Sequence, residues 1–121
     1  MPYKYLNLNP LGFREEDCVC RAISLASGYS YAQIKDKLYY VSQLLECEEL
    51  CICCYHHLLD DVFKYDRLDC QGMTVEEVAN LFPNGTLLCR LEGHLTCIID
   101  GICYDTWDCT DLKVDIVWIV D

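Results

Sequence analysis

Residues 94–107 read HLTCIIDGICYDTW, and the fold that we predict for this chain follows from them. Two runs rich in β-branched and aromatic residues flank the pair Asp100-Gly101, which favours a two-residue turn between antiparallel strands. With that pair as the turn, Ile99 lies opposite Ile102, and the pairing continues outward along both runs. The sequence therefore predicts a β-hairpin of defined register.

The same register places four side chains on one face of the hairpin, because side chains alternate between the two faces of a strand. These are His94, Thr96, Asp105 and Trp107. Asp105 is then the diagonal neighbour of His94, at roughly 7–8 Å between Cα atoms, so the two side chains can meet. Trp107 would lie beside the imidazole and keep water from that contact. A register slip of one residue would move Asp105 to the other face.

The rest of the chain reads as helices first and strands last. Apolar and β-branched runs predict strands at 86–91, 94–100, 102–107 and 114–120. Apolar periodicity and capping signals predict helices at 18–27, from about 31 to 45, around 56–65 and from 74 to about 82. Helices followed by an antiparallel sheet indicate an α+β fold, which we assign to a single domain over residues 1–121.

Several helix ends carry local signals. Glu16 and Asp17 stand before the first helix, where carboxylates can bond free N–H groups, and Gly28 follows its last turn. Ser30 is placed to cap the second helix. Residues 74–77, T-V-E-E, match a capping box and predict the start of the last helix.

The composition limits the class of protein. The chain has 121 residues and a formal net charge of −11, which argues against nucleic acid as the main partner, because phosphate binding needs clustered Lys and Arg. No apolar run approaches the roughly 18 residues of a membrane-spanning helix, and the first residues do not resemble a secretory signal. We therefore expect a cytoplasmic protein that binds neither nucleic acid nor membrane, with its oligomeric state left open.

Eleven cysteines are unusual for a chain of this length. Their number is odd, and Cys89 and Cys97 lie inside strand-like apolar runs. We interpret most of them as buried free thiols that act as small hydrophobic residues, which implies a reducing compartment.

Three residues could form a catalytic site. Cys18 lies at the predicted start of the first helix, where free N–H groups and the helix dipole lower the pKa of a thiol. His94 is suited to act as its base near neutral pH, and Asp105 would hold the imidazole in one orientation. On this hypothesis Asp105→Asn should leave the fold nearly intact and still impair catalysis. Cys20 is a rival nucleophile, about 200° around the helix from Cys18.

The segments DCVCRA (17–22), GH (93–94) and YDTWD (104–108) together resemble the papain-like cysteine peptidases, and in particular small papain-like proteins of bacteriophages and bacteria. The resemblance implies a helix that carries the nucleophile, packed on an antiparallel sheet that carries the base. It also implies a thiol hydrolase that cleaves an amide, isopeptide or thioester bond through Cys18, His94 and Asp105. The expected substrate is a protein or peptide, or a host protein in the host cytoplasm if the chain is phage-encoded.

One feature of the family is missing. Papain-like enzymes usually place a glutamine several residues before the nucleophile to stabilise the oxyanion, and residues 7–17 contain none. Asn7 or Asn9 could substitute, beside the backbone N–H of Cys18. The alternative is a catalytically weak or inactive papain-like scaffold that binds and inhibits a host defence protein.

Residues 47–57 form a second group of interest, with four cysteines and two histidines at short spacing. Cysteine and histidine can bind zinc, and Cys70 could complete such a set, but adjacent Cys53-Cys54 and His56-His57 are not typical of a zinc finger. We expect this segment to pack with free thiols and assign no metal and no cofactor to the protein. A zinc-binding interaction domain is the third alternative.

Overall fold

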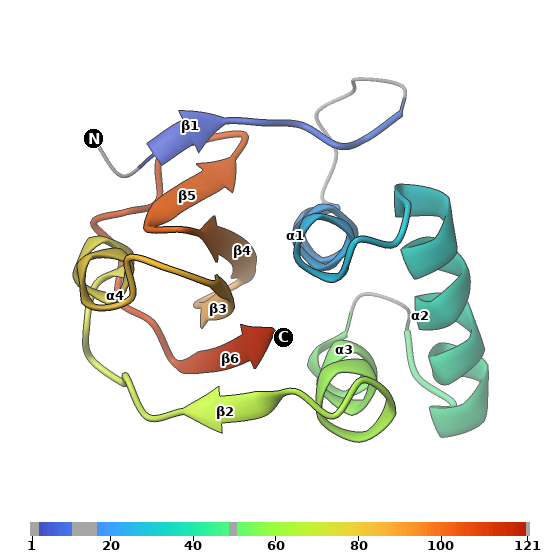
Figure 1. The fold of residues 1–121 in the computed structure, drawn as a ribbon. Helices are drawn as coiled ribbons and strands as arrows, with labels where there is room; N and C mark the ends of the chain where they lie inside the picture. Colours follow the sequence, from blue (N-terminus) through green and yellow to red (C-terminus); the bar gives the residue numbers. More distant parts are fainter. Residues whose placement is uncertain (1–2, 11–16, 49–50, 121) are drawn as a thin grey trace.

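The computed structural model describes residues 3–10, 17–48 and 51–120, and a six-stranded sheet lies at its centre. The strands follow one another across the sheet in the order β1-β5-β4-β3-β6-β2 (Figure 1). Their bounds are Tyr3–Tyr5 (β1), Asp66–Leu68 (β2), Thr86–Leu91 (β3), His94–Ile99 (β4), Ile102–Asp105 (β5) and Ile116–Val120 (β6). β1 runs parallel to β5, while the other neighbouring strands are antiparallel.

The hairpin between β4 and β5 has the predicted register. Ile99 pairs with Ile102, and the pairing continues to Cys97 opposite Tyr104. Asp100 and Gly101 both have positive φ, 50° and 79°, as a type I′ turn requires. The strands are slightly shorter than predicted, because β4 ends at Ile99 and β5 ends at Asp105.

Helices cover both faces of the sheet (Figure 1). Their bounds are Cys18–Ser27 (α1), Tyr31–Leu45 (α2), Ile52–His57 (α3) and Val75–Leu81 (α4), and a π-helical turn, η1, continues α3 over Leu58–Val62. α1 packs directly on the sheet, with α3 beside it and α2 outside them, whereas α4 lies against the opposite face.

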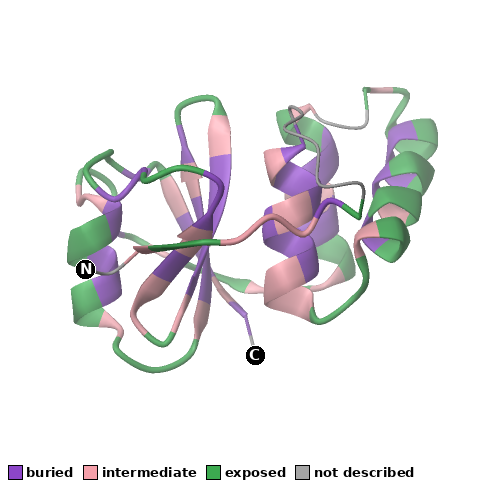
Figure 2. Ribbon diagram, turned by 90° about the horizontal axis from the view of Figure 1, so that it is seen from above, coloured by how far each residue is buried: buried purple, intermediate pink, exposed green. Residues whose placement is uncertain are grey.

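Two hydrophobic cores follow from this arrangement. Leu88, Cys97 and Trp118 face α1, α2 and α3. Their sequence neighbours Leu87 and Ile98 face α4. In Figure 2 the central strands are coloured as buried or intermediate along their length. Because β3, β4 and β6 carry apolar residues at successive positions, which point to opposite faces, both faces of these strands need cover.

The helix predictions hold for three of the four segments. α1 spans 18–27 and ends at Gly28, which has a φ of 82°. α2 begins after Ser30, whose side chain forms a capping box with Gln33, and Thr74 starts α4 in the same way. Asp17 is the N-cap of α1 but makes no capping hydrogen bond through its side chain, while Glu16 lies outside the described residues.

Other predictions were wrong in part. The helix expected around 56–65 begins earlier, at Ile52, and changes to a π-helix at Leu58. The last strand starts at Ile116 rather than at residue 114. The sheet is mixed rather than purely antiparallel, because β1 adds a parallel edge. β1 and β2 have three residues each, too few for an alternating pattern to show in the sequence.

All eleven cysteines are free thiols. Seven of them are buried, as expected for thiols that serve as small hydrophobic residues. Within the described residues, no helix has both the length and the apolar character required to cross a membrane.

The turn at Gly101 offers a test of the fold. We expect Gly101→Ala to lower the free energy of unfolding by about 1–2 kcal/mol, since an L-residue pays that cost in the left-handed region. An added Cβ would lie 3.4 Å from the carbonyl oxygen of Ala79, an ordinary contact, so the loss would come from the backbone. Gly101→Asn should lose less, because Asn tolerates positive φ. Equilibrium urea unfolding measures both, and an alanine variant as stable as the original would contradict the turn.

Candidate active site

Cys18 is the first residue of α1, and this helix packs against the strand that carries His94. The thiol is partly exposed, and it lies close enough to His94 for that residue to lower the pKa of Cys18. The structure therefore brings the predicted nucleophile and the predicted base together. Because Nε2 of His94 bonds Asp105, the ring nitrogen that remains for Cys18 is Nδ1.

His94 and Asp105 form a short polar contact, with 2.6 Å between Nε2 and Oδ2. Their side chains are only 9% and 4% exposed. The ring of Trp107 lies 4.9 Å from the imidazole, centroid to centroid, as the hairpin register predicted. The three predicted residues Cys18, His94 and Asp105 thus lie together, with His94 bonded to Asp105 and lining the same cleft as Cys18.

The carboxylate of Asp105 accepts five hydrogen bonds, three at Oδ2 and two at Oδ1, and the longest of them is from Sγ of Cys109 to Oδ2 at 3.9 Å. Oδ2 accepts from His94 and from the hydroxyl of Thr96 at 2.7 Å. Oδ1 accepts from the backbone N–H of Thr106 at 2.7 Å and from Nη1 of Arg21 at 3.3 Å. A buried carboxylate is stable only with such partners.

This surrounding determines how an amide would sit in place of Asp105. Arg21 and the backbone N–H of Thr106 can only donate, so the amide oxygen of an asparagine would face them. Its NH₂ group would then face Nε2 of His94 and force that nitrogen to accept. The ring would carry its proton on Nδ1, toward Cys18, and could not be held as an imidazolium.

Arg21 is the site residue that the sequence reasoning missed. Its Nε lies 2.6 Å from Oδ1 of Asp17, and its Nη1 reaches Asp105 and the hydroxyl of Thr106. Arg21 thereby connects α1 to the end of β5. The spacing of Asp17 and Arg21, four residues apart at a helix start, was the available signal.

Asp17 anchors the other end of this network. It is 6% exposed and accepts hydrogen bonds from Arg21, from the hydroxyl of Tyr31 and from Nδ2 of Asn9. Burial alone would raise the pKa of Asp17, but these bonds outweigh burial and lower it. Asp17 is therefore used to position Arg21, not to cap α1.

The electrostatics of the pair favour an ionised thiol. Burial alone would raise the pKa of Cys18, but hydrogen bonds with His94 and with the backbone of Leu95 outweigh it and lower the pKa. Burial would likewise lower the pKa of His94, and the bond to Asp105 reverses this and raises it. A thiol pKa that is lowered beside an imidazole pKa that is raised favours a thiolate–imidazolium pair.

The pair opens onto a cleft of about 600 Å³. Cys18, His94 and Trp107 line it on one side, and Tyr55 and Arg90 line it as well. Burial raises the pKa of Tyr55 to about 12, and the positive charge of Arg90 nearby offsets only part of this rise. Tyr55 therefore stays protonated near neutral pH and can donate a hydrogen bond.

The two candidate oxyanion donors, Asn7 and Asn9, and the rival nucleophile Cys20 all have other contacts in the structure. Nδ2 of Asn9 bonds the carboxylate of Asp17, and Oδ1 of Asn7 accepts from the backbone N–H of Asn9. Both asparagines thus take part in the N-terminal network. Cys20 is 4% exposed and belongs to the core beneath α1, away from the cleft, as its helix position predicted.

The second group, residues 47–57, is brought together only in part. The sulfur atoms of Cys47, Cys51 and Cys53 lie within 4.8 Å of one another. Cys54 is buried and bonds the carbonyl of Leu38 instead. Cys70 cannot complete this set, because it belongs to the core on the opposite face of the sheet.

Comparison with known proteins finds no family model, no curated protein and no solved structure that matches this chain.

The ion pair predicts how Cys18 reacts with iodoacetamide. An ordinary thiol with a pKa of about 8.5 is only about 0.3% ionised at pH 6. We expect Cys18 to stay reactive with iodoacetamide at pH 6, and Asp105→Asn to slow its alkylation at this pH at least about tenfold. The difference in rate should be smaller than the difference in thiolate fraction, because a thiolate of lower pKa is a weaker nucleophile. Mass spectrometry of the peptide that contains Cys18 measures the rate at each pH.

Asp108→Asn is the matched control, because Asp108 is exposed and bonds Thr110. It should leave the rate unchanged. Equal rates for the original protein and Asp105→Asn at pH 6 would contradict the assigned role of Asp105.

Proposed function

We propose that this chain is a thiol hydrolase of papain-like type, with Cys18 as nucleophile, His94 as acid and base and Asp105 as the group that orients His94. The observation that carries this proposal is that Cys18 and His94 line one cleft, with His94 bonded to the buried carboxylate of Asp105. A helix N-terminus, an adjacent imidazole and a buried carboxylate are the means by which proteins activate a thiol.

The reaction would proceed in two halves. The Cys18 thiolate attacks the carbonyl carbon of the substrate, and His94 gives its proton to the departing amine or thiol, leaving an acyl group on sulfur. His94 then takes a proton from water, which attacks the thioester and releases the acid. Asp105 keeps the Nε2 proton of His94 in place and stabilises the imidazolium in both halves.

The developing oxyanion needs donors. Cys18 opens α1, so its backbone N–H has no partner within the helix and can serve as one. In place of the family's glutamine, we propose the Tyr55 hydroxyl as the second donor. The positive charge of Arg90 lies close to Tyr55 in the same cleft. Tyr55 lines the cleft with Cys18 and comes from α3, a different element from the one that bears the family's usual donor.

The proposed substrate is a protein or peptide that presents an amide, isopeptide or thioester bond. The cleft is bordered by Trp107, which is 41% exposed, and by the apolar Ile52. A flexible peptide tail or a small conjugated protein fits an open cleft better than a rigid substrate does. A bacteriophage origin and a host protein as target rest on the sequence resemblance alone.

One observation favours a second candidate, a papain-like scaffold that acts by binding and inhibiting a host defence protein. The amide of Asn9, which could have replaced the missing glutamine, bonds Asp17 instead. If Tyr55 does not stabilise an oxyanion, the thiolate would be reactive and turnover would still be slow.

The chemistry is tested with p-nitrophenyl acetate and with a biotinylated peptide vinyl sulfone. We expect a burst of p-nitrophenol equal to the enzyme concentration, and one vinyl sulfone adduct, on Cys18. Cys18→Ala should abolish both, whereas Cys20→Ala, which removes a thiol two residues away in the core, should retain them. Labelling of Cys20, or a burst that survives Cys18→Ala, would refute the proposal.

Tyr55→Phe separates the two candidates. Phenylalanine keeps the ring contacts with His56 and Trp118, so the fold should persist. Loss of one oxyanion donor typically costs about 10²–10³-fold in kcat, and we expect a loss of this order in ester hydrolysis. Alkylation of Cys18 by iodoacetamide forms no oxyanion and should be unchanged. A phenylalanine variant with the original kcat would exclude Tyr55 as a donor, and a reactive Cys18 without any turnover would favour the scaffold.

A further inference from the structure

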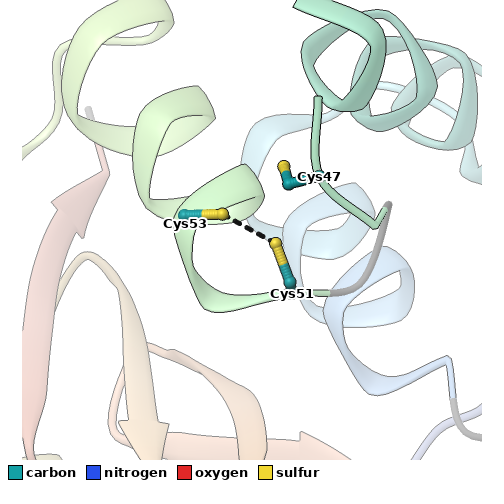
Figure 3. A group of neighbouring side chains, drawn as sticks. All are labelled: Cys47, Cys51 and Cys53. Atoms are coloured by element: carbon teal, nitrogen blue, oxygen red, sulfur yellow. Dashed lines mark hydrogen bonds between the residues drawn. The ribbon is translucent and has the colours of Figure 1, made fainter. Parts of the chain in front are cut away.

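Three cysteines gather between the end of α2 and the start of α3 (Figure 3). Cys47 follows α2, Cys51 is the N-cap of α3, and Cys53 is in its first turn. We call these three residues the thiol cluster. Their sulfur atoms lie within 4.8 Å of one another, and those of Cys51 and Cys53 are in contact at 2.8 Å.

Backbone contacts shape the chain around the thiol cluster. Glu46 ends α2 in the left-handed region, with a φ of 54°, and the N–H of Cys47 then donates to the carbonyl of Ser42. The N–H of Cys51 donates to the carbonyl of Glu48, and the carbonyl of Cys51 accepts from Cys54 in the first turn of α3. The cluster is thus supported by hydrogen bonds from two helix ends.

Core packing does not explain these thiols. Seven of the eleven cysteines are buried, and of the four that are not, one is Cys18 and the other three form the thiol cluster. Cys47 and Cys51 lie at the rim of the core, and Cys53 is exposed. Packing accounts for Cys47 and Cys51 only in part and for the exposed Cys53 hardly at all, so the grouping of three accessible thiols points to a further role.

The neighbouring cysteine and histidines do not belong to the group of close ligand atoms in this segment. Cys54 donates to the carbonyl of Leu38, and Nδ1 of His57 lies 2.9 Å from Asp61. His56 packs against the ring of Trp118, at 5.3 Å between centroids. A metal in this segment would therefore be held by the thiol cluster and not by the adjacent Cys-Cys and His-His pairs.

We propose that the thiol cluster binds one thiophilic metal ion, Zn²⁺ or Cu⁺. Three thiolates at this spacing are soft ligands, which select these ions over Mg²⁺ or Ca²⁺. Cu⁺ is satisfied by the three sulfurs alone, whereas tetrahedral Zn²⁺ would take a fourth donor from solvent. The partial exposure of all three residues gives an ion access from the surface.

The position of the cluster links it to the cleft. Ile52 stands between two of the ligands and lines the cleft, and Tyr55 follows one turn later on the same helix. An ion held by Cys47, Cys51 and Cys53 would tie the end of α2 to the start of α3 and so hold this wall in place. The proposal itself does not depend on whether Cys18 is catalytic.

Metal binding is tested on the full chain after reduction with a phosphine and removal of metal by a chelator. Zn²⁺ is titrated in competition with a chromophoric chelator, and Cu⁺ in competition with bathocuproine disulfonate. We expect one equivalent of at least one of these ions to bind, and the preferred ion to be identified by comparing the two series. Co²⁺ should give the intense thiolate charge-transfer absorption of a multi-cysteine site.

We expect each single serine variant of the cluster to weaken metal binding at least about tenfold: Cys47→Ser, Cys51→Ser and Cys53→Ser. Loss of a residue that only supports a metal ligand already costs about 10–100-fold in affinity, and loss of a ligand should cost no less. Cys18→Ser is the matched control, since Cys18 is also partly exposed but lies outside the cluster, and it should bind as the original does. Far-ultraviolet circular dichroism checks that the serine variants are folded.

Three outcomes would overturn the proposal. The first is binding of neither ion more tightly than to the triple serine variant of the cluster. The second is stoichiometric binding that survives the triple variant and is lost in Cys109→Ser, which would place the ion at His94, Asp105 and Cys109, the other group of close ligand atoms among the described residues. The third is a Cys51–Cys53 disulfide that persists under reduction, detected as a loss of two mass units.

Discussion

The buried carboxylate of Asp105 is the group on which the rest of the structure depends. A charge with 4% side-chain exposure is tolerated only if every lone pair that it presents has a partner. Those partners come from α1, from β4 and from the turn after β5. These contacts hold α1 against the end of the hairpin, and the same arrangement places Cys18 beside His94 at the cleft.

Arg21 contributes both to the packing of α1 on the sheet and to the electrostatics of the site. Its contact with Asp17 orients it, and its contacts with Asp105 and Thr106 join α1 to the sheet edge. A cation at this position also supports the negative charge of Cys18 and of Asp105. Removing Arg21 would disturb the fold and the site together, so its role cannot be assigned to either one alone.

The eleven cysteines serve two physical purposes. Those in the strands and in α4's core fill space between apolar side chains, and burial raises the pKa of Cys89 and Cys97, which keeps them inert. The accessible ones lie at helix starts and ends, where backbone N–H groups and neighbouring thiols are within reach. The cleft is lined by Cys18 and by residues of α3, the helix that carries part of the thiol cluster.

The features that could be predicted from the sequence are those that depend on interactions between neighbouring residues. The Asp100-Gly101 turn, the caps at Ser30 and Thr74 and the alternation of side chains depend on a few adjacent residues, and they sufficed to place His94 beside Asp105. Other contacts could be seen only in the folded chain. Arg21 bonds Asp105, and Asn9 bonds Asp17. Tyr55 lines the cleft, and α4 covers the second face of the sheet. Each of these contacts compensates a buried charge or covers an apolar surface, and the partner that does so is chosen by proximity in space, which no local pattern records.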